Sequence, residues 1–208
     1  ALNAVAYQAL GGRSGAVLVE NYKTGEILCM VSSPSYDPAT PPDLSSPAYE
    51  GVFINRCLGS SFVPGSVFKL VTLAAAIEQL PDLESRRFSC AGGVTVGGEY
   101  IACTAAHGEQ TIEQALANSC NVVFSALSQE LGAETIYEYA TRYGLLESFS
   151  VSGIETAAGS LDKPENGTGS LSWMGIGQDK DLVSPVSMLR LTAAIANGGQ
   201  AREPVLLK

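Results

Sequence analysis

The sequence predicts an α+β fold in which helices flank an antiparallel sheet. Two apolar runs near the start, residues 16–20 and 26–31, are typical of strands, and the turn between them places Gly25 where a positive φ is needed. Most of the later chain shows the caps and stops of helices, and this order of elements is that of an α+β protein. Because an isolated hairpin is marginally stable, we expect further strands from outside these 208 residues.

Helices are expected wherever an apolar pattern lies between a start signal and a stop signal. Residues 111–114, Thr-Ile-Glu-Gln, form a capping box, and Gly11, Gly132 and Gly144 each end an apolar pattern. The helices predicted in this way are 1–11, 66–80, 111–117, 121–131, 133–143 and 184–196. The Pro- and Ser-rich segment 32–47 and the Gly- and Ser-rich segment 147–181 are expected to be loops.

Composition limits the kind of protein. With 208 residues, 46% hydrophobic and 16% charged, the chain suits one large domain over residues 1–208. A net charge of −9 argues against nucleic acid as a partner, because phosphates need a basic face. No apolar run reaches the roughly 20 residues needed to cross a bilayer. The first ten residues have the pattern of a helix entered mid-course, so we expect a piece of a longer protein.

The five cysteines leave the redox setting open. Cys90 and Cys103 flank the turn-rich stretch AGGVTVGGEYIA, which could bring them together in a small hairpin. A disulfide there would imply an oxidising compartment, and two reduced thiols are the alternative. Cys29 and Cys57 lie among apolar residues and are expected in the core. Since the chain has no C-x-x-C and a single histidine, His107, we predict no metal site and no cofactor.

The segment SVFKLVTLAAAI, residues 66–77, carries the strongest chemical signal. Nine of its twelve residues are apolar, and the exceptions Ser66, Lys69 and Thr72 follow each other at i, i+3 and i+6. They therefore line one side of a buried helix. Burial lowers the pKa of a lysine, which makes Lys69 a plausible proton acceptor one turn from the Ser66 hydroxyl. The pattern predicts a serine nucleophile with a lysine base.

A second motif lies 53 residues further on, at Ser119-Cys120-Asn121, in a break between two predicted helices. Together the two motifs resemble the transpeptidase domain of class B penicillin-binding proteins, of the serine DD-transpeptidase and β-lactamase-like superfamily. The resemblance also extends to GAVLVENYKTGEILCMVSSPSYDP, NRCLGSSFVPGSVFKLVTLAAAIE, HGEQTIEQALANSCNVVF and WMGIGQDKDLVSPVSMLRLTAAIANGG, and so to essentially the whole chain.

This resemblance implies a function and a location. Ser66 would attack D-Ala-D-Ala stem peptides of peptidoglycan and form an acyl-enzyme, with Lys69 taking its proton. Ser119 would relay a proton to the leaving amine, and Asn121 would bind the substrate backbone. β-Lactam antibiotics would acylate Ser66 in the same way. The protein would act on the extracytoplasmic face of the bacterial membrane, anchored outside this chain and working with other cell-wall synthesis proteins.

The family's third motif, Lys-Thr/Ser-Gly, follows the second motif on a strand across the cleft. Lys23-Thr24-Gly25 has the right residues, but it precedes even Ser66, so we assign it to the turn of the first hairpin. The genuine motif and the C-terminal strands are therefore missing from these residues. We expect little transpeptidation from the 208 residues alone.

Two other functions stay open from the residues. A serine β-lactamase or a β-lactam sensor shares Ser-x-x-Lys, but a β-lactamase often has its water-activating base in Glu-x-x-Leu-Asn. Here Glu113-Gln-Ala-Leu is followed by Ala117. A non-catalytic scaffold of the same fold would fit the absent third motif, yet it has no chemical reason to keep both other motifs intact.

Overall fold

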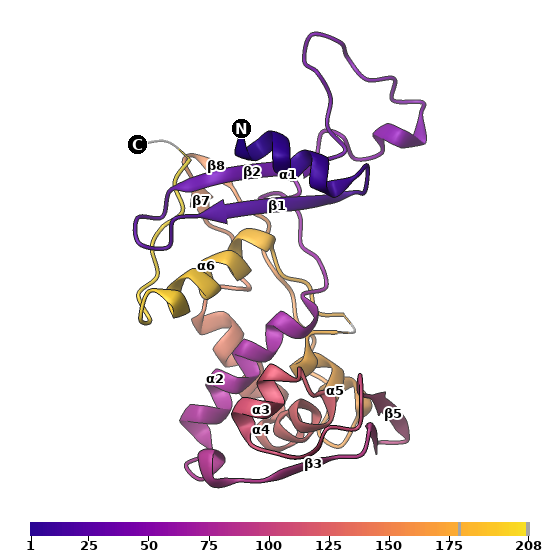
Figure 1. The fold of residues 1–208 in the computed structure, drawn as a ribbon, viewed down its shortest axis with the longest axis vertical. Coiled ribbons are helices and arrows are strands. Elements are labelled where there is room, and N and C mark those ends of the chain that lie inside the picture. Colours follow the sequence, from indigo (N-terminus) through magenta and orange to yellow (C-terminus); the bar gives the residue numbers. More distant parts are fainter. Residues whose placement is uncertain (179, 207–208) are drawn as a thin grey trace. The chain divides into compact units, whose positions relative to one another are not determined.

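The computed structural model describes residues 1–178 and 180–206, which form two compact units (Figure 1). The sheet unit contains Ala1–Phe62, Glu147–Gly159 and the segment from Val183 on. The helical unit contains Val63–Leu146 and Ser160–Leu182. Each unit has its own cluster of buried apolar side chains. The single domain predicted over residues 1–208 thus divides, by its internal contacts, into two bodies that we describe separately.

The sheet unit is built on the predicted N-terminal hairpin. Strands β1 (Gly15–Glu20) and β2 (Ile27–Ser33) pair antiparallel, and Gly25 in the turn has φ 79°, as the sequence predicted. Helices α1 (Leu2–Leu10) and α6 (Pro185–Ala196) pack against this hairpin. The backbone N–H of Ile27 donates to the Val205 carbonyl at 2.8 Å, so a segment from the other end of the chain extends the hairpin.

The remaining elements of the sheet unit are short. They are a 3-10 turn, η1 (Pro47–Tyr49), and the strand pair β7 (Ser150–Val151) and β8 (Ile154–Glu155). The core of this unit contains Cys57, Leu58, Val151 and Val186. Cys29 and Cys57 are 2% and 0% exposed, which confirms that both belong to the interior.

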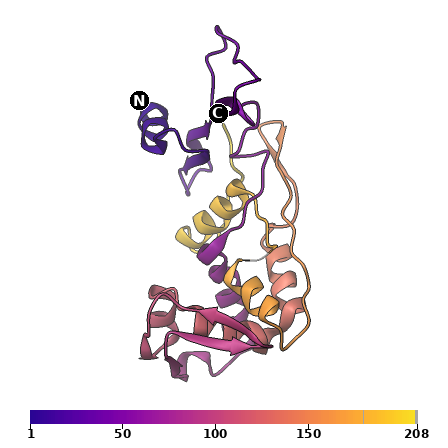
Figure 2. The same ribbon diagram turned by 90° about the vertical axis from the view of Figure 1, so that its right-hand side faces the viewer.

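The helical unit is built around one long helix, α4. Its helices are α2 (Lys69–Gln79), α3 (Ile112–Ala117), α4 (Asn121–Arg142) and α5 (Gly169–Ile176), with 3-10 turns η2 (Gly65–Phe68) and η3 (Leu83–Ser85). Two small antiparallel pairs, β3 (Phe88–Cys90) with β6 (Gly108–Gln110) and β4 (Gly93–Val96) with β5 (Glu99–Ala102), lie against these helices (Figure 2). Gly132, at φ 77° and ψ 160°, breaks α4 where the sequence predicted a stop.

One local prediction was wrong. Helix α5 lies inside 147–181, which we expected to be a loop; its Gly- and Ser-rich sequence has low helix propensity, and burial of Leu171, Met174 and Ile176 stabilises it instead. Thr168 caps it by accepting the Leu171 N–H. The predicted start of the last helix is confirmed: Ser184 is the N-cap of α6 and Pro185 its first residue, although the buried Ser184 hydroxyl makes no capping hydrogen bond.

The described helices also bear on membrane insertion. Among the residues that the structure describes, none of the helices combines the length and the apolar character that crossing a bilayer requires.

Candidate active site

The predicted nucleophile lies on a tight turn and not on a regular α-helix. Gly65, at φ 62°, opens the 3-10 turn η2, and the α-helix α2 begins only at Lys69. Ser66 is exposed on this turn, whereas Lys69 is only 1% exposed. The turn therefore presents the hydroxyl to solvent and keeps the amine in the interior, as a nucleophile and its base require.

The third polar residue of the buried stripe has a structural role. Thr72 is fully buried, and its hydroxyl donates to the Gly175 carbonyl of α5 at 2.7 Å. The backbone N–H of Gly65 donates to the Gly177 carbonyl at 2.7 Å, just after the same helix. Helix α5, which the sequence did not predict, thus fixes α2 and the turn that carries Ser66.

The Lys69 amine lies within hydrogen-bond distance of every other predicted catalytic and binding residue. Its Nζ lies 3.2 Å from Ser66 Oγ, 2.9 Å from Ser119 Oγ, 2.7 Å from the Ser119 carbonyl and 2.7 Å from Asn121 Oδ1. An ammonium has three N–H donors, so these four oxygens exceed what it can satisfy with separate hydrogen bonds. The structure therefore brings Ser66, Lys69, Ser119 and Asn121 together around one amine.

The second motif forms a strained turn between α3 and α4. Ser119 has φ 50°, a left-handed conformation that costs a non-glycine residue roughly 1–3 kcal/mol. Two backbone hydrogen bonds hold the turn: Ser119 N–H to the Leu116 carbonyl at 2.9 Å, and Cys120 N–H to the Ala115 carbonyl at 2.8 Å. The capping box that begins α3 at Thr111 anchors the other end of this helix. In this turn the Ser119 hydroxyl lies within hydrogen-bond distance of Lys69 Nζ.

Asn121 connects the amine to the neighbouring strand. Besides accepting from Lys69, its side-chain Nδ2 donates to the Ala102 carbonyl at 2.8 Å. Nδ2 carries two N–H groups, so one of them stays available for another acceptor. The backbone N–H of Asn121 lies 3.3 Å from Cys103 Sγ, which places a thiol directly beside the motif.

Burial sets the protonation of Lys69. Removal from water lowers the pKa of Lys69 to about 8, although the nearby thiols of Cys103 and Cys120 act in the opposite direction. The Phe124 ring, with its centroid 5.5 Å from Nζ, lines the same interior. The amine is therefore partly neutral near physiological pH and can accept a proton from Ser66, as the sequence predicted for a buried lysine.

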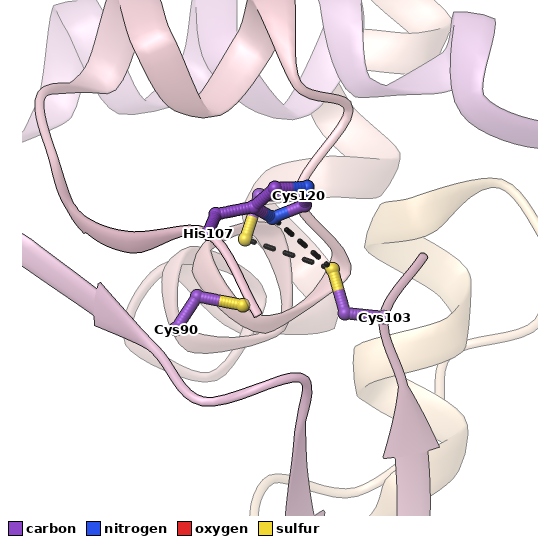
Figure 3. A group of neighbouring side chains, drawn as sticks. All are labelled: Cys90, Cys103, His107 and Cys120. Carbon is purple, nitrogen blue, oxygen red and sulfur yellow. Dashed lines mark hydrogen bonds between the residues drawn. The ribbon is translucent and has the colours of Figure 1, made fainter. Parts of the chain in front are cut away.

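The cysteines bear on two expectations from the sequence. Cys90 and Cys103 flank the β4–β5 hairpin, as expected, and both are free thiols, which is the reduced alternative to the candidate disulfide between them. The sequence also gave no reason to expect a metal-binding cluster, yet Cys90, Cys103, His107 and Cys120 lie together (Figure 3). Sequence spacing missed this cluster because separate elements supply its members; Cys120, the middle residue of the second motif, was the available signal.

Comparison with known proteins agrees with the motifs. The family model of the penicillin-binding protein transpeptidase domain matches residues 15–208. Stage V sporulation protein D of Bacillus subtilis is 32% identical over 90% of this chain and 29% of its own length. The peptidoglycan D,D-transpeptidase PbpA of Mycobacterium tuberculosis is 28% identical over 95% of this chain and 43% of its own length.

Solved structures agree as well. Penicillin-binding protein A of M. tuberculosis, as a ceftriaxone acyl-enzyme complex, superposes with a TM-score of 0.79 and 27% identity, covering 93% of this chain and 47% of that one. The fold and the motifs define a penicillin-binding protein of α+β architecture. The chain belongs to the penicillin-binding protein transpeptidase domain family. It spans 29% and 43% of the two curated relatives described above.

Proposed function

We propose that this chain carries the serine nucleophile and general base of a peptidoglycan D,D-transpeptidase. The observation that supports the proposal best is the position of Lys69 Nζ, 3.2 Å from Ser66 Oγ and 2.9 Å from Ser119 Oγ. These are distances at which a proton can pass between the groups. A relative that bears the name D,D-transpeptidase, and an acyl-enzyme complex among the structural neighbours, support the same reaction class.

The residues divide the reaction between them. Neutral Lys69 accepts the Ser66 proton while Ser66 Oγ bonds to the carbonyl carbon of the penultimate D-alanine. Ser119 passes a proton from Lys69 to the leaving amine of the terminal D-alanine. The unused Nδ2 N–H of Asn121 binds the peptide backbone, and the Ser66 N–H, in the 3-10 turn that precedes α2, is one oxyanion donor. An amine of a second stem peptide then attacks the ester and forms the cross-link.

The wider setting follows from this function. We propose that residues 1–208 form part of one transpeptidase domain on the extracytoplasmic face of a bacterial membrane. The native protein would be membrane-anchored and would work with other proteins of cell-wall synthesis. Its ligands would be stem peptides and β-lactam antibiotics, and the net charge of −9 argues against nucleic acid.

Treatment of the native protein with a penicillin, followed by intact-mass and peptide mass spectrometry, tests this function. We expect one long-lived adduct per chain, located on Ser66, and no adduct in Ser66→Ala. Ser61→Ala is the matched control, because Ser61 is a nearby serine without a lysine contact in the described hydrogen bonds. Rapid hydrolysis of the adduct would indicate a β-lactamase, and the absence of any adduct would indicate a non-catalytic scaffold.

The pH dependence of acylation tests the role of Lys69. Because burial lowers the pKa of Lys69 to about 8, the neutral base is the minor form at pH 7 and the major form above pH 8. We expect the acylation rate to rise about tenfold per pH unit below that pKa and to level off above it. Stopped-flow measurement with a fluorescent penicillin between pH 6 and pH 9 would check this. A rate that falls with rising pH through this range would contradict a lysine base.

A further inference from the structure

A second cluster of reactive side chains lies next to the second motif, in the helical unit. Its members are Cys90 at the end of β3, Cys103 just after β5, His107 in the loop before β6, and Cys120 at the N-cap of α4. The three sulfur atoms and one imidazole nitrogen all lie within 4.8 Å of one another. Figure 3 shows the side chains converging from separate elements on one point.

The spacing of these atoms is that of ligands around a tetrahedral metal ion. With Zn–S bonds of about 2.3 Å and Zn–N bonds of about 2.05 Å, a tetrahedron has S···S edges of about 3.8 Å and S···N edges of about 3.6 Å. Cys103 Sγ lies 3.8 Å from Cys120 Sγ and 3.6 Å from His107 Nδ1. Two edges of the cluster therefore already have the lengths that a zinc ion would impose.

We propose that Cys90, Cys103, His107 and Cys120 bind one zinc ion in a closed, structural site. Three cysteines and one histidine are an established ligand set for structural zinc, and four protein ligands leave no open position for a substrate. A disulfide would use two of the sulfur atoms and would not account for the position of the third sulfur and the imidazole beside them. The proposal goes beyond the transpeptidase reaction and does not depend on it.

The surroundings of Cys103 supply a hydrogen-bond donor to the thiolate that zinc requires. The backbone N–H of Asn121 lies 3.3 Å from Cys103 Sγ, at the N-terminus of α4, where helix N–H groups favour negative charge. On binding, three thiols would release three protons, so Zn²⁺, three thiolates and a neutral imidazole would carry a net charge of −1.

The site would act on the catalytic residues through the chain itself. Cys120 is the middle residue of Ser119-Cys120-Asn121, and Cys103 Sγ accepts the Asn121 backbone N–H. The metal would join β3, β5 and the loop before β6 to the turn in which Ser119 has φ 50°. We therefore assign the zinc ion a positioning role, in which it holds the strained turn so that Ser119 and Asn121 reach Lys69.

Metal content is the test. Native protein purified under reducing conditions without chelators is analysed by inductively coupled plasma mass spectrometry, together with Cys90→Ser, His107→Ala and the control Cys29→Ser. Cys29 is also buried and free, but it lies in the sheet unit outside the cluster. We expect about one zinc per chain in the native protein and the control, and at least about a tenfold loss in both ligand variants.

A spectroscopic measurement covers the case in which a variant does not fold. Replacing zinc by Co²⁺ in the native protein should give the intense visible bands of a tetrahedral site with thiolate ligands, and one equivalent of Zn²⁺ should abolish them. One result would overturn the proposal: reduced native protein that is supplied with Zn²⁺ binds no metal, and its three cluster thiols all react with a thiol reagent. It is equally overturned if those cysteines keep a disulfide after reduction. Neither measurement requires acylation of Ser66. If the zinc proposal failed, the transpeptidase proposal would therefore be unaffected.

Discussion

Lys69→Met is expected to lower the rate of penicillin acylation by about 10³-fold, the size of effect attributed to a positioned general base. Methionine has a similar length and suits the buried position, which is 1% exposed, but it has no basic nitrogen. The variant also leaves Ser119 Oγ and Asn121 Oδ1 without their common donor. Acylation is measured by stopped-flow with a fluorescent penicillin, and folding by near-ultraviolet circular dichroism and the Tm.

Two further variants separate the role of the base from that of a structural donor. Lys69→Gln keeps N–H donors for the neighbouring oxygens but cannot accept the Ser66 proton, and we expect the same loss of rate. Lys163→Met, which removes an exposed lysine paired with Glu134, should acylate at the native rate. The residual activity of the Lys69 variants should lose its pH dependence near pH 8. A Lys69→Gln variant that keeps the native rate and profile would refute the assignment of Lys69 as base.

The residues that we propose as catalytic could be singled out from the sequence because their chemistry depends on local spacing. Ser66 and Lys69 are one helical turn apart, and Ser119 and Asn121 flank a single residue. Each pair fixes its own geometry once its turn or helix forms. The polarity of the segment was equally informative, since nine apolar residues out of twelve predicted a buried helix, and Lys69 is buried in it. The contact between the two pairs came from the resemblance and is confirmed by the hydrogen bonds of Lys69.

The elements that the sequence missed depend on long-range packing. Helix α5 has two glycines and two serines in eight residues, and its stability comes from side chains buried against α4 and from the Thr72–Gly175 hydrogen bond. The small strand pairs likewise have too few residues for a local sequence pattern to predict them. They nevertheless bring Cys90, Cys103 and His107 to Cys120. The four side chains come from three separated stretches of chain, at 90, 103–107 and 120, so a search for C-x-x-C could not find them.

Gly177→Ala is expected to destabilise the helical unit and to displace the nucleophile turn. Gly177 has φ 83°, and a Cβ there would lie 2.3 Å from the Gly65 carbonyl oxygen and 2.4 Å from Phe68 Cβ, on either side of Ser66. Left-handed strain and overpacking together should lower the free energy of unfolding by about 2–5 kcal/mol. A shift of about 1 Å in Ser66 relative to Lys69 should slow acylation about 10²-fold.

Gly167→Ala is the matched control for Gly177→Ala, because it separates backbone strain from steric collision. Gly167 lies in the same unit at φ 82°, and a Cβ there would meet nothing within 4 Å. It should therefore lose only the roughly 1–2 kcal/mol of left-handed strain and should acylate at the native rate. Urea unfolding and stopped-flow acylation of both variants measure the difference. Equal losses in the two variants would show that Gly177 is needed only for its backbone conformation, and that its contact with the turn of Ser66 does not position the nucleophile.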